Sequence, residues 1–137
     1  MTIKVQSEAA IQGDIVVAMS RTFDARTVHV PNGGKRSARE GVALRSMGVW
    51  AGHPDLIVYG EDHRSFLMEV KDEILACERT VPTDQRFDTL DPKQKIAVTE
   101  LRSRGFVVHV VDNVDDAIAA GRAFGLPAKK SLAGVCA

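Results

Sequence analysis

Apolar residues recur along the chain at the spacings of short amphipathic elements. Between residues 8 and 19 they occupy the i, i+4, i+7 and i+8 positions of one helix face, and Ser7 is placed to cap that helix. Later helix signals are a Ser-x-x-Glu capping box at residues 37–40, an Asp-Pro-x-Gln capping box at residues 91–94, and a stop at Gly125. The sequence therefore predicts helices over residues 8–19, 38–47, 92–105 and 114–124.

Compact apolar runs between these helices predict four β-strands. The segments 55–59 and 65–71 are separated by a short polar turn, which indicates a hairpin. The run 106–111 is apolar almost throughout, which is typical of a strand buried on both faces. Together with a short strand at 27–30, the order is α, β, α, β, β, α, β, α. This order predicts an α/β fold in which helices flank a mixed sheet.

The chain of 137 residues has the length of one globular domain, which we place at residues 1–126. Residues 72–90 are polar and charged, contain Pro82 and show no sustained periodicity, so they predict a long loop. The tail at residues 127–137 is expected to be weakly ordered. No apolar run reaches the length of a membrane span and the N-terminus lacks a signal-peptide core, so we expect a cytoplasmic protein without membrane contact.

Charge is balanced overall but uneven along the chain. Lys and Arg together number 18, as do Asp and Glu, which excludes a polycationic protein that binds nucleic acid by bulk charge. Residues 1–54 contain seven basic and four acidic side chains, residues 55–91 four and ten, and residues 92–137 seven and four. This distribution is expected where an acidic segment builds a metal site between segments that bind phosphates.

Three polar side chains interrupt the apolar pattern of the predicted hairpin. Asp55 begins one strand, and Glu69 and Lys71 lie in the next. Alternation places Glu69 and Lys71 on one face, and pairing of the strands would bring Asp55 to Glu69. Converging carboxylates repel each other unless a cation lies between them, and oxygen ligands favour a hard ion such as Mg²⁺. The alternative is that Glu69 and Lys71 are solvated partners on an edge strand.

These residues stand in a recognisable order. Gly52-His53-Pro54-Asp55, followed about fourteen residues later by Glu69-Val70-Lys71, resembles the signature of the PD-(D/E)XK nuclease superfamily. Over roughly residues 8–118 the chain resembles the VRR-NUC family of virus-type replication and repair nucleases. The further motifs are Pro31-Asn32-Gly33-Gly34 before a helix, Gly48 and Gly52 before the Pro-Asp, Pro-x-Gln at residues 92–94, and a helix running to Gly105 before an apolar strand.

The resemblance implies a restriction-endonuclease-like core and a metal site. Asp55 and Glu69 would be the metal-binding carboxylates, with the backbone carbonyl of Val70 as a further ligand. Lys71 would position or activate the attacking water. The implied cofactor is Mg²⁺, for which Mn²⁺ would substitute, and no small-molecule organic cofactor is expected.

Two further positions match the family less closely. Glu8 matches its helical acid, which helps to hold the metal or its water shell, and Gln94 matches the glutamine beside the catalytic lysine. The family usually has a short glycine-containing link and often Ser-Pro before this glutamine, whereas here a long insertion ends in Asp91-Pro92. Asp91 would cap the helix as serine does, and the insertion is a candidate for altering substrate choice.

The segment around the second predicted helix supplies the candidate DNA contacts. Basic side chains and a glycine turn there suit phosphate binding, although a solvated helix face is the alternative. The candidates are Asn32, Gly33, Lys35, Arg36, Arg39 and Arg45.

The resemblance implies a Mg²⁺-dependent endonuclease that cuts branched DNA, in particular the four-way Holliday junction, in phage or bacterial replication and repair. Resolving a junction takes two symmetric cuts, so a homodimer is expected. Expected product ends are 5′-phosphate and 3′-hydroxyl. The alternatives are a flap- or nick-directed nuclease of the same chemistry, a DNA-binding module without activity, and an α/β domain that binds protein partners.

Overall fold

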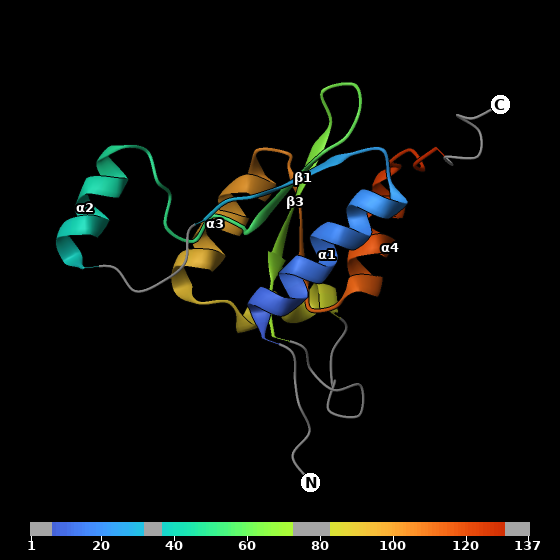
Figure 1. Cartoon of the computed structure of the whole chain (residues 1–137). Coiled ribbons are helices and arrows are strands. Elements are labelled where there is room, and N and C mark those ends of the chain that lie inside the picture. The colour runs from blue at the N-terminus through green and yellow to red at the C-terminus, as the bar shows by residue number, and fades with distance from the viewer. Residues whose placement is uncertain (1–6, 32–36, 73–82, 131–137) are drawn as a thin grey trace, which may run out of the picture.

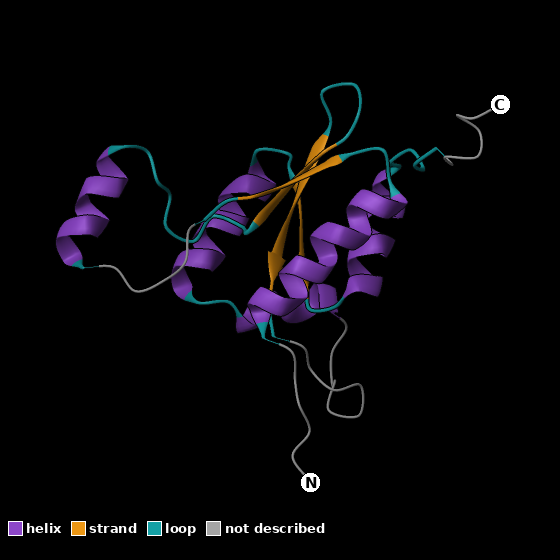
Figure 2. Cartoon of the chain, viewed as in Figure 1, coloured by secondary structure: helices purple, strands orange, loops and turns teal. Residues whose placement is uncertain are grey.

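The computed structural model describes residues 7–31, 37–72 and 83–130. In this part of the chain a four-stranded sheet lies between helices, in the order that the sequence predicts (Figures 1 and 2). The elements are α1 (Glu8–Thr22), β1 (Arg26–His29), α2 (Ala38–Ser46), β2 (Leu56–Tyr59), β3 (Ser65–Val70), the 3-10 helix η1 (Thr83–Thr89), α3 (Pro92–Ser103), β4 (Val107–Val111) and α4 (Val114–Phe124).

The sheet is mixed, and its strands lie side by side in the order β1-β2-β3-β4. β1 pairs with β2 and β2 with β3 in antiparallel fashion, whereas β3 and β4 are parallel. The antiparallel hairpin predicted for residues 55–71 is therefore confirmed. In its register Leu56 lies opposite Met68, which puts the preceding residue, Asp55, at the level of Glu69.

Strand alternation gives the sheet two apolar faces. α1 and α4 cover one face and α3 covers the other, as Figure 1 shows. The first core contains Ile11, Ile15, Met19, Leu56, Val58, Phe66, Met68 and Val70. The second contains Leu67, Leu90, Val98, Leu101, Val108 and Val110. Glu69 is two residues after Leu67 on the same strand, so its side chain lies on the same face of the sheet and faces α3 rather than α1.

The helices begin where the sequence predicts, but α1 extends three residues beyond its predicted end, to Thr22, and α3 ends at Ser103, two residues before its predicted end. Ser7 and Ser37 accept hydrogen bonds from backbone amides in the first turns of α1 and α2, and Asp91 forms a reciprocal capping box at the start of α3. α4 ends at Gly125, whose φ of 85° favours glycine. α2 has no buried residue, and it stands away from the sheet in Figure 1.

Two parts of the structure differ from the prediction. The described end of the long loop forms η1, which is held by buried Arg86 and followed by buried Leu90; residues 73–82 lie outside the described part. The run 106–111 does not form a strand buried on both faces, because β4 lies at one edge of the sheet and Val107 is 42% exposed. An apolar run does not determine strand order, and the fully covered strand is β3 instead.

The start of the C-terminal tail pairs with the end of α1. The Asp24 amide donates to the carbonyl of Pro127 (2.8 Å), and the Lys129 amide donates to that of Thr22 (3.0 Å). Residues 131–137 lie outside the described part, so the division at residue 126 stays a prediction. No helix in the described ranges has both the length and the apolar character needed to cross a membrane.

Candidate active site

Two carboxyl groups meet at the end of the sheet where β2 begins and β3 ends. Asp55 directly precedes β2, and its Oδ2 accepts a hydrogen bond from the backbone amide of Val70 (2.8 Å). Glu69 lies across from it on β3, and the two carboxyl groups interact directly. The strand register therefore brings Asp55 and Glu69 together, as alternation and pairing predict.

Glu69 is buried although its side chain is acidic. The residue is 2% exposed, and its Oε1 accepts a hydrogen bond from Nε2 of Gln94 (2.8 Å). Its Oε2 is buried and has no hydrogen-bond partner among the described residues. A solvated pair on an edge strand is therefore excluded for Glu69, because β3 is an interior strand. A buried oxygen without a donor is an acceptor suited to a cation or a proton.

Burial raises the pKa of both acids, and the charge of Asp55 adds to the shift at Glu69. Burial, together with the negative charge of Asp55, raises the pKa of Glu69 to about 9, although the ammonium of Lys71 opposes the shift. Burial also raises the pKa of Asp55, while its hydrogen bond from the Val70 amide lowers it. At neutral pH the pair therefore holds a proton at a position where a cation would serve the same purpose.

We expect the metal-free protein to lose stability as the pH rises from about 5 towards 9. The folded-state pKa of Glu69 lies above its ordinary value of 4.5, so in this window the folded chain binds more protons than the unfolded chain. For each extra proton that the folded chain binds, the free energy of unfolding falls by up to about 1.4 kcal/mol per pH unit. The shift at Asp55 has the same sign.

Thermal unfolding in EDTA across this pH range measures the effect. Glu69→Gln should flatten the slope, and the exposed control Glu100→Gln should keep it. A slope that is the same in wild type and Glu69→Gln would contradict this interpretation.

Lys71 and Gln94 complete the inner part of the site. Nζ of Lys71 donates to Oε1 of Gln94 (2.9 Å), while Nε2 of the same amide donates to Glu69. Oε1 of Gln94 also accepts from the backbone amide of Asp91 (3.1 Å), and the Gln94 amide donates to Asp91 Oδ1 (2.9 Å). The capping box that starts α3 thus fixes the side chain that links Lys71 to Glu69.

Glu8 lies at the outer edge of this site, as the first residue of α1. Its pKa is raised, mainly by partial burial; the Lys71 ammonium lowers it, and the carboxylates of Asp72 and Asp55 raise it. The structure thus brings Glu8 within electrostatic range of the other predicted site residues, although its side chain is exposed.

Gly52 packs directly against the start of α3. A Cβ at Gly52 would lie 2.8 Å from the Gln94 amide nitrogen and closer still to the carbonyl of Lys93, and Gly52 has a φ of 88°. Only glycine permits both the close approach and the left-handed conformation. The sequence singled out this glycine, and the structure shows that it allows the loop before Asp55 to contact α3.

Gly52→Ala is expected to destabilise the fold and displace Gln94. The left-handed conformation alone costs about 1–2 kcal/mol, and the backbone clash adds to it. Gly48→Ala isolates the first contribution, because Gly48 has a φ of 96° but no neighbouring atom within 4 Å of the added Cβ. In denaturant unfolding, Gly52→Ala should lose clearly more free energy of unfolding than Gly48→Ala. Equal losses in the two variants would show that the backbone clash does not contribute.

Arg86 and Asp112 were not predicted as part of the site region. Nη1 of Arg86 donates to Oδ2 of Asp112 (2.9 Å) and to the backbone carbonyl of Asp72 (2.9 Å), next to Lys71. The Arg86 and Asp112 side chains are 8% and 0% exposed. The sequence signal for this pair is Asp112, an acidic residue directly after the apolar run 106–111. A carboxylate buried beside such a run needs a cationic partner.

The predicted DNA contacts are only partly described. Arg39 and Arg45 lie on α2 and are exposed. Asn32, Gly33, Lys35 and Arg36 lie outside the described residues.

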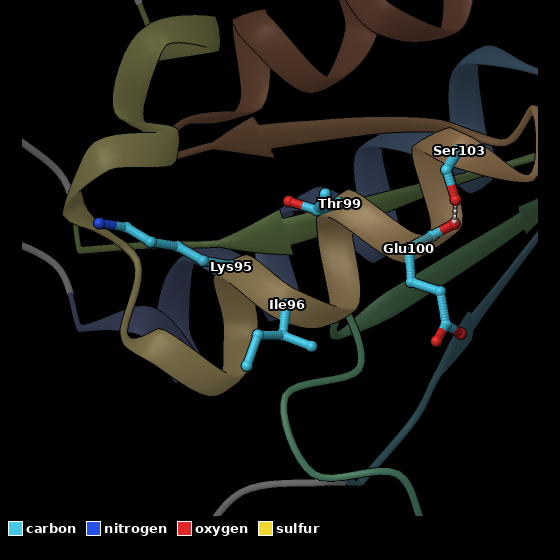
Figure 3. A pocket seen from close by; sticks show the side chains of 5 residues that line it. All are labelled: Lys95, Ile96, Thr99, Glu100 and Ser103. Carbon is cyan, nitrogen blue, oxygen red and sulfur yellow. Dashed lines mark hydrogen bonds between the residues drawn. The ribbon is translucent and has the colours of Figure 1, made fainter.

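A separate hollow of about 330 Å³ lies along α3 (Figure 3). It is lined by Lys95, Ile96, Thr99, Glu100 and Ser103. Its lining includes neither Asp55 nor Glu69, so the hollow is separate from the carboxyl pair.

The donor set suits a hard divalent cation. In the described ranges no group of three or more His, Cys, Asp or Glu side chains forms a metal cluster. Asp55 and Glu69 nevertheless supply two carboxyl groups, and the unpartnered Oε2 of Glu69 is an acceptor that a cation would satisfy. Mg²⁺ usually binds proteins through one or two carboxylates and keeps several waters, which agrees with this set.

The described elements form an α/β fold in which helices flank a four-stranded mixed sheet. No family model matches the chain, and no curated protein matches it in sequence. Among solved structures, a "VRR_NUC domain protein" superimposes with a TM-score of 0.57 at 22% sequence identity, over 88% of this chain and 89% of that chain. This likeness establishes the VRR_NUC fold, which the sequence motifs predict.

Proposed function

We propose that the chain is a divalent-metal-dependent nuclease of the VRR-NUC family that hydrolyses phosphodiester bonds in DNA. The observation that carries this proposal is the carboxyl pair of half-buried Asp55 and buried Glu69 beside Lys71, with one Glu69 oxygen left without a donor. The likeness to a VRR_NUC domain protein supports it.

The residues that would hold Mg²⁺ or Mn²⁺ are Asp55, Glu69 and the backbone carbonyl of Val70, with Glu8 holding the water shell. When bound, such an ion neutralises phosphate charge and lowers the pKa of a coordinated water. The two carboxyl groups then no longer need the shared proton. Because Glu69 is only 2% exposed, bulk water has little access to its carboxyl group.

Lys71 acts on the attacking water and on the phosphate. An ammonium has three donors, so Lys71 binds Gln94 and still reaches a water or a phosphate oxygen. Its charge stabilises the negative charge that develops in phosphoryl transfer. Gln94 holds the Lys71 side chain towards Glu69, and the helix cap at Asp91 holds Gln94.

For the substrate we propose branched DNA, and the Holliday junction in particular, cut by a homodimer in the cytoplasm of a bacterium or an infected host. The exposed Arg39 and Arg45 on α2 support a DNA contact outside the site, since phosphate contacts position DNA without reading its sequence. Asn32, Gly33, Lys35 and Arg36 would extend that contact.

The substrate is tested on an end-labelled four-way junction, a flapped duplex, a nicked duplex and a linear duplex with the same arms. Paired cuts confined to the junction support the proposal. If flapped or nicked DNA is cut and the junction is not, the cut DNA is the substrate in place of the junction. If the protein binds DNA but cuts none of it under any condition, it is a DNA-binding module.

A further inference from the structure

We propose that Asp72 is a positioning residue of the metal site, which holds the N-terminus of α1 so that Glu8 faces Asp55 and Lys71. This inference rests on the proposed function, because it assigns Asp72 a part in metal binding. Asp72 directly follows Lys71 in the sequence, and neither the motifs nor the fold likeness assigns it a role.

The first amides of α1 are capped from two different places. A helix N-terminus leaves its first backbone amides without partners inside the helix. Oγ of Ser7 accepts from the Ala10 amide (3.3 Å), which is local capping. Oδ1 of Asp72 accepts from the Glu8 amide (2.9 Å), 64 residues away in the sequence. Asp72 thereby fixes the backbone of Glu8 itself relative to the end of β3.

Asp72 is in turn held on a rigid part of the structure. The backbone amide of Lys71 donates to the carbonyl of Val111 (2.9 Å), which extends the pairing of β3 with β4 by one residue. The Asp72 carbonyl accepts from buried Arg86 (2.9 Å), whose same nitrogen binds Asp112 (2.9 Å). Since β4 holds the backbone at Lys71 and η1 holds that of Asp72, the Asp72 side chain fixes the start of α1 relative to both elements.

The geometry separates two roles for this carboxylate. A negative charge at a helix N-terminus is favourable, but a charge at this place also repels Glu8. If Asp72 acts as a hydrogen-bond acceptor, asparagine should preserve metal binding, because its side-chain carbonyl oxygen accepts in the same place. If Asp72 acts through its charge, asparagine should weaken metal binding as much as alanine does.

The test is calorimetric titration of the whole chain with Mn²⁺ alone. We expect Asp72→Ala to bind Mn²⁺ about tenfold more weakly than wild type, as is typical when a residue supporting metal ligands is lost. Asp72→Asn should bind within about twofold of wild type. Ser37→Ala, which removes the cap of α2, is the matched control for loss of a helix cap and should leave the affinity unchanged.

A second readout follows the contact without metal. In the metal-free protein, amide hydrogen exchange at Glu8 should accelerate in Asp72→Ala and stay slow in Asp72→Asn. Equal Mn²⁺ affinity of wild type and Asp72→Ala, or equal weakening in both variants, overturns the positioning role while leaving the nuclease proposal in place. A wild type that binds no Mn²⁺ overturns the proposed function and this inference together.

Discussion

Glu69→Gln is expected to lower DNA cleavage by about a thousandfold without destabilising the protein at neutral pH. The amide carries no negative charge, so it loses the interaction with a divalent cation, and losses of this size are typical when one electrostatic group of an active site is removed. Stability is retained because Glu69 holds its proton at neutral pH, with a pKa of about 9, and glutamine has the shape of that neutral acid. Single-turnover cleavage rates and thermal unfolding of the same preparations measure both effects.

Lys71→Met is expected to lower DNA cleavage as well, because it removes the positive charge of the site. It removes the charge but keeps much of the apolar stem, so the cleavage rate should fall while DNA binding persists. Glu100→Gln on the outer part of α3 is the surface control and should cut at the wild-type rate. Cleavage by Glu69→Gln at more than about a tenth of the wild-type rate would show that the carboxyl pair is not the active site.

The second large effect concerns stability. Arg86→Met should lower the free energy of unfolding by about 3–5 kcal/mol, because it leaves the Asp112 carboxylate buried without its cation. Arg104→Met is the control, since the Arg104–Glu100 pair is 3.5 Å long and its side chains are 65% and 49% exposed, so its loss should cost less than about 1 kcal/mol.

The double variant Arg86→Met with Asp112→Leu separates pairing from packing. Replacing both partners removes the unpaired charge, so part of the stability should return, as measured by urea denaturation. If the two single changes and the double change were simply additive, the buried ion pair would not account for the loss.

The sequence predicted the parts of this site that depend on local rules. Alternation put Glu69 and Lys71 on one face, and hairpin pairing put Asp55 beside Glu69, because both rules act over a few residues. The capping box predicted that Gln94 lies in the first turn of α3. The Gln94 side-chain amide both caps the helix and joins Lys71 to Glu69. The second contact depends on how α3 packs on the sheet, and no local sequence pattern determines that packing.

Contacts between distant segments could not be predicted in this way. Asp72 binds the start of α1, and Arg86 lies in a segment without periodicity, so neither has a sequence signal. The apolar run 106–111 predicted a strand correctly, but its edge position follows from strand order, which the run does not encode.

The most direct test of the account is the cleavage of branched and linear DNA by purified wild-type protein in Mg²⁺ and in EDTA, with the chemistry of the new ends determined. We predict cleavage in Mg²⁺ alone, with 5′-phosphate and 3′-hydroxyl ends. Equal cleavage in EDTA, or none with any DNA in either Mg²⁺ or Mn²⁺, would contradict a metal-dependent nuclease site at Asp55, Glu69 and Lys71.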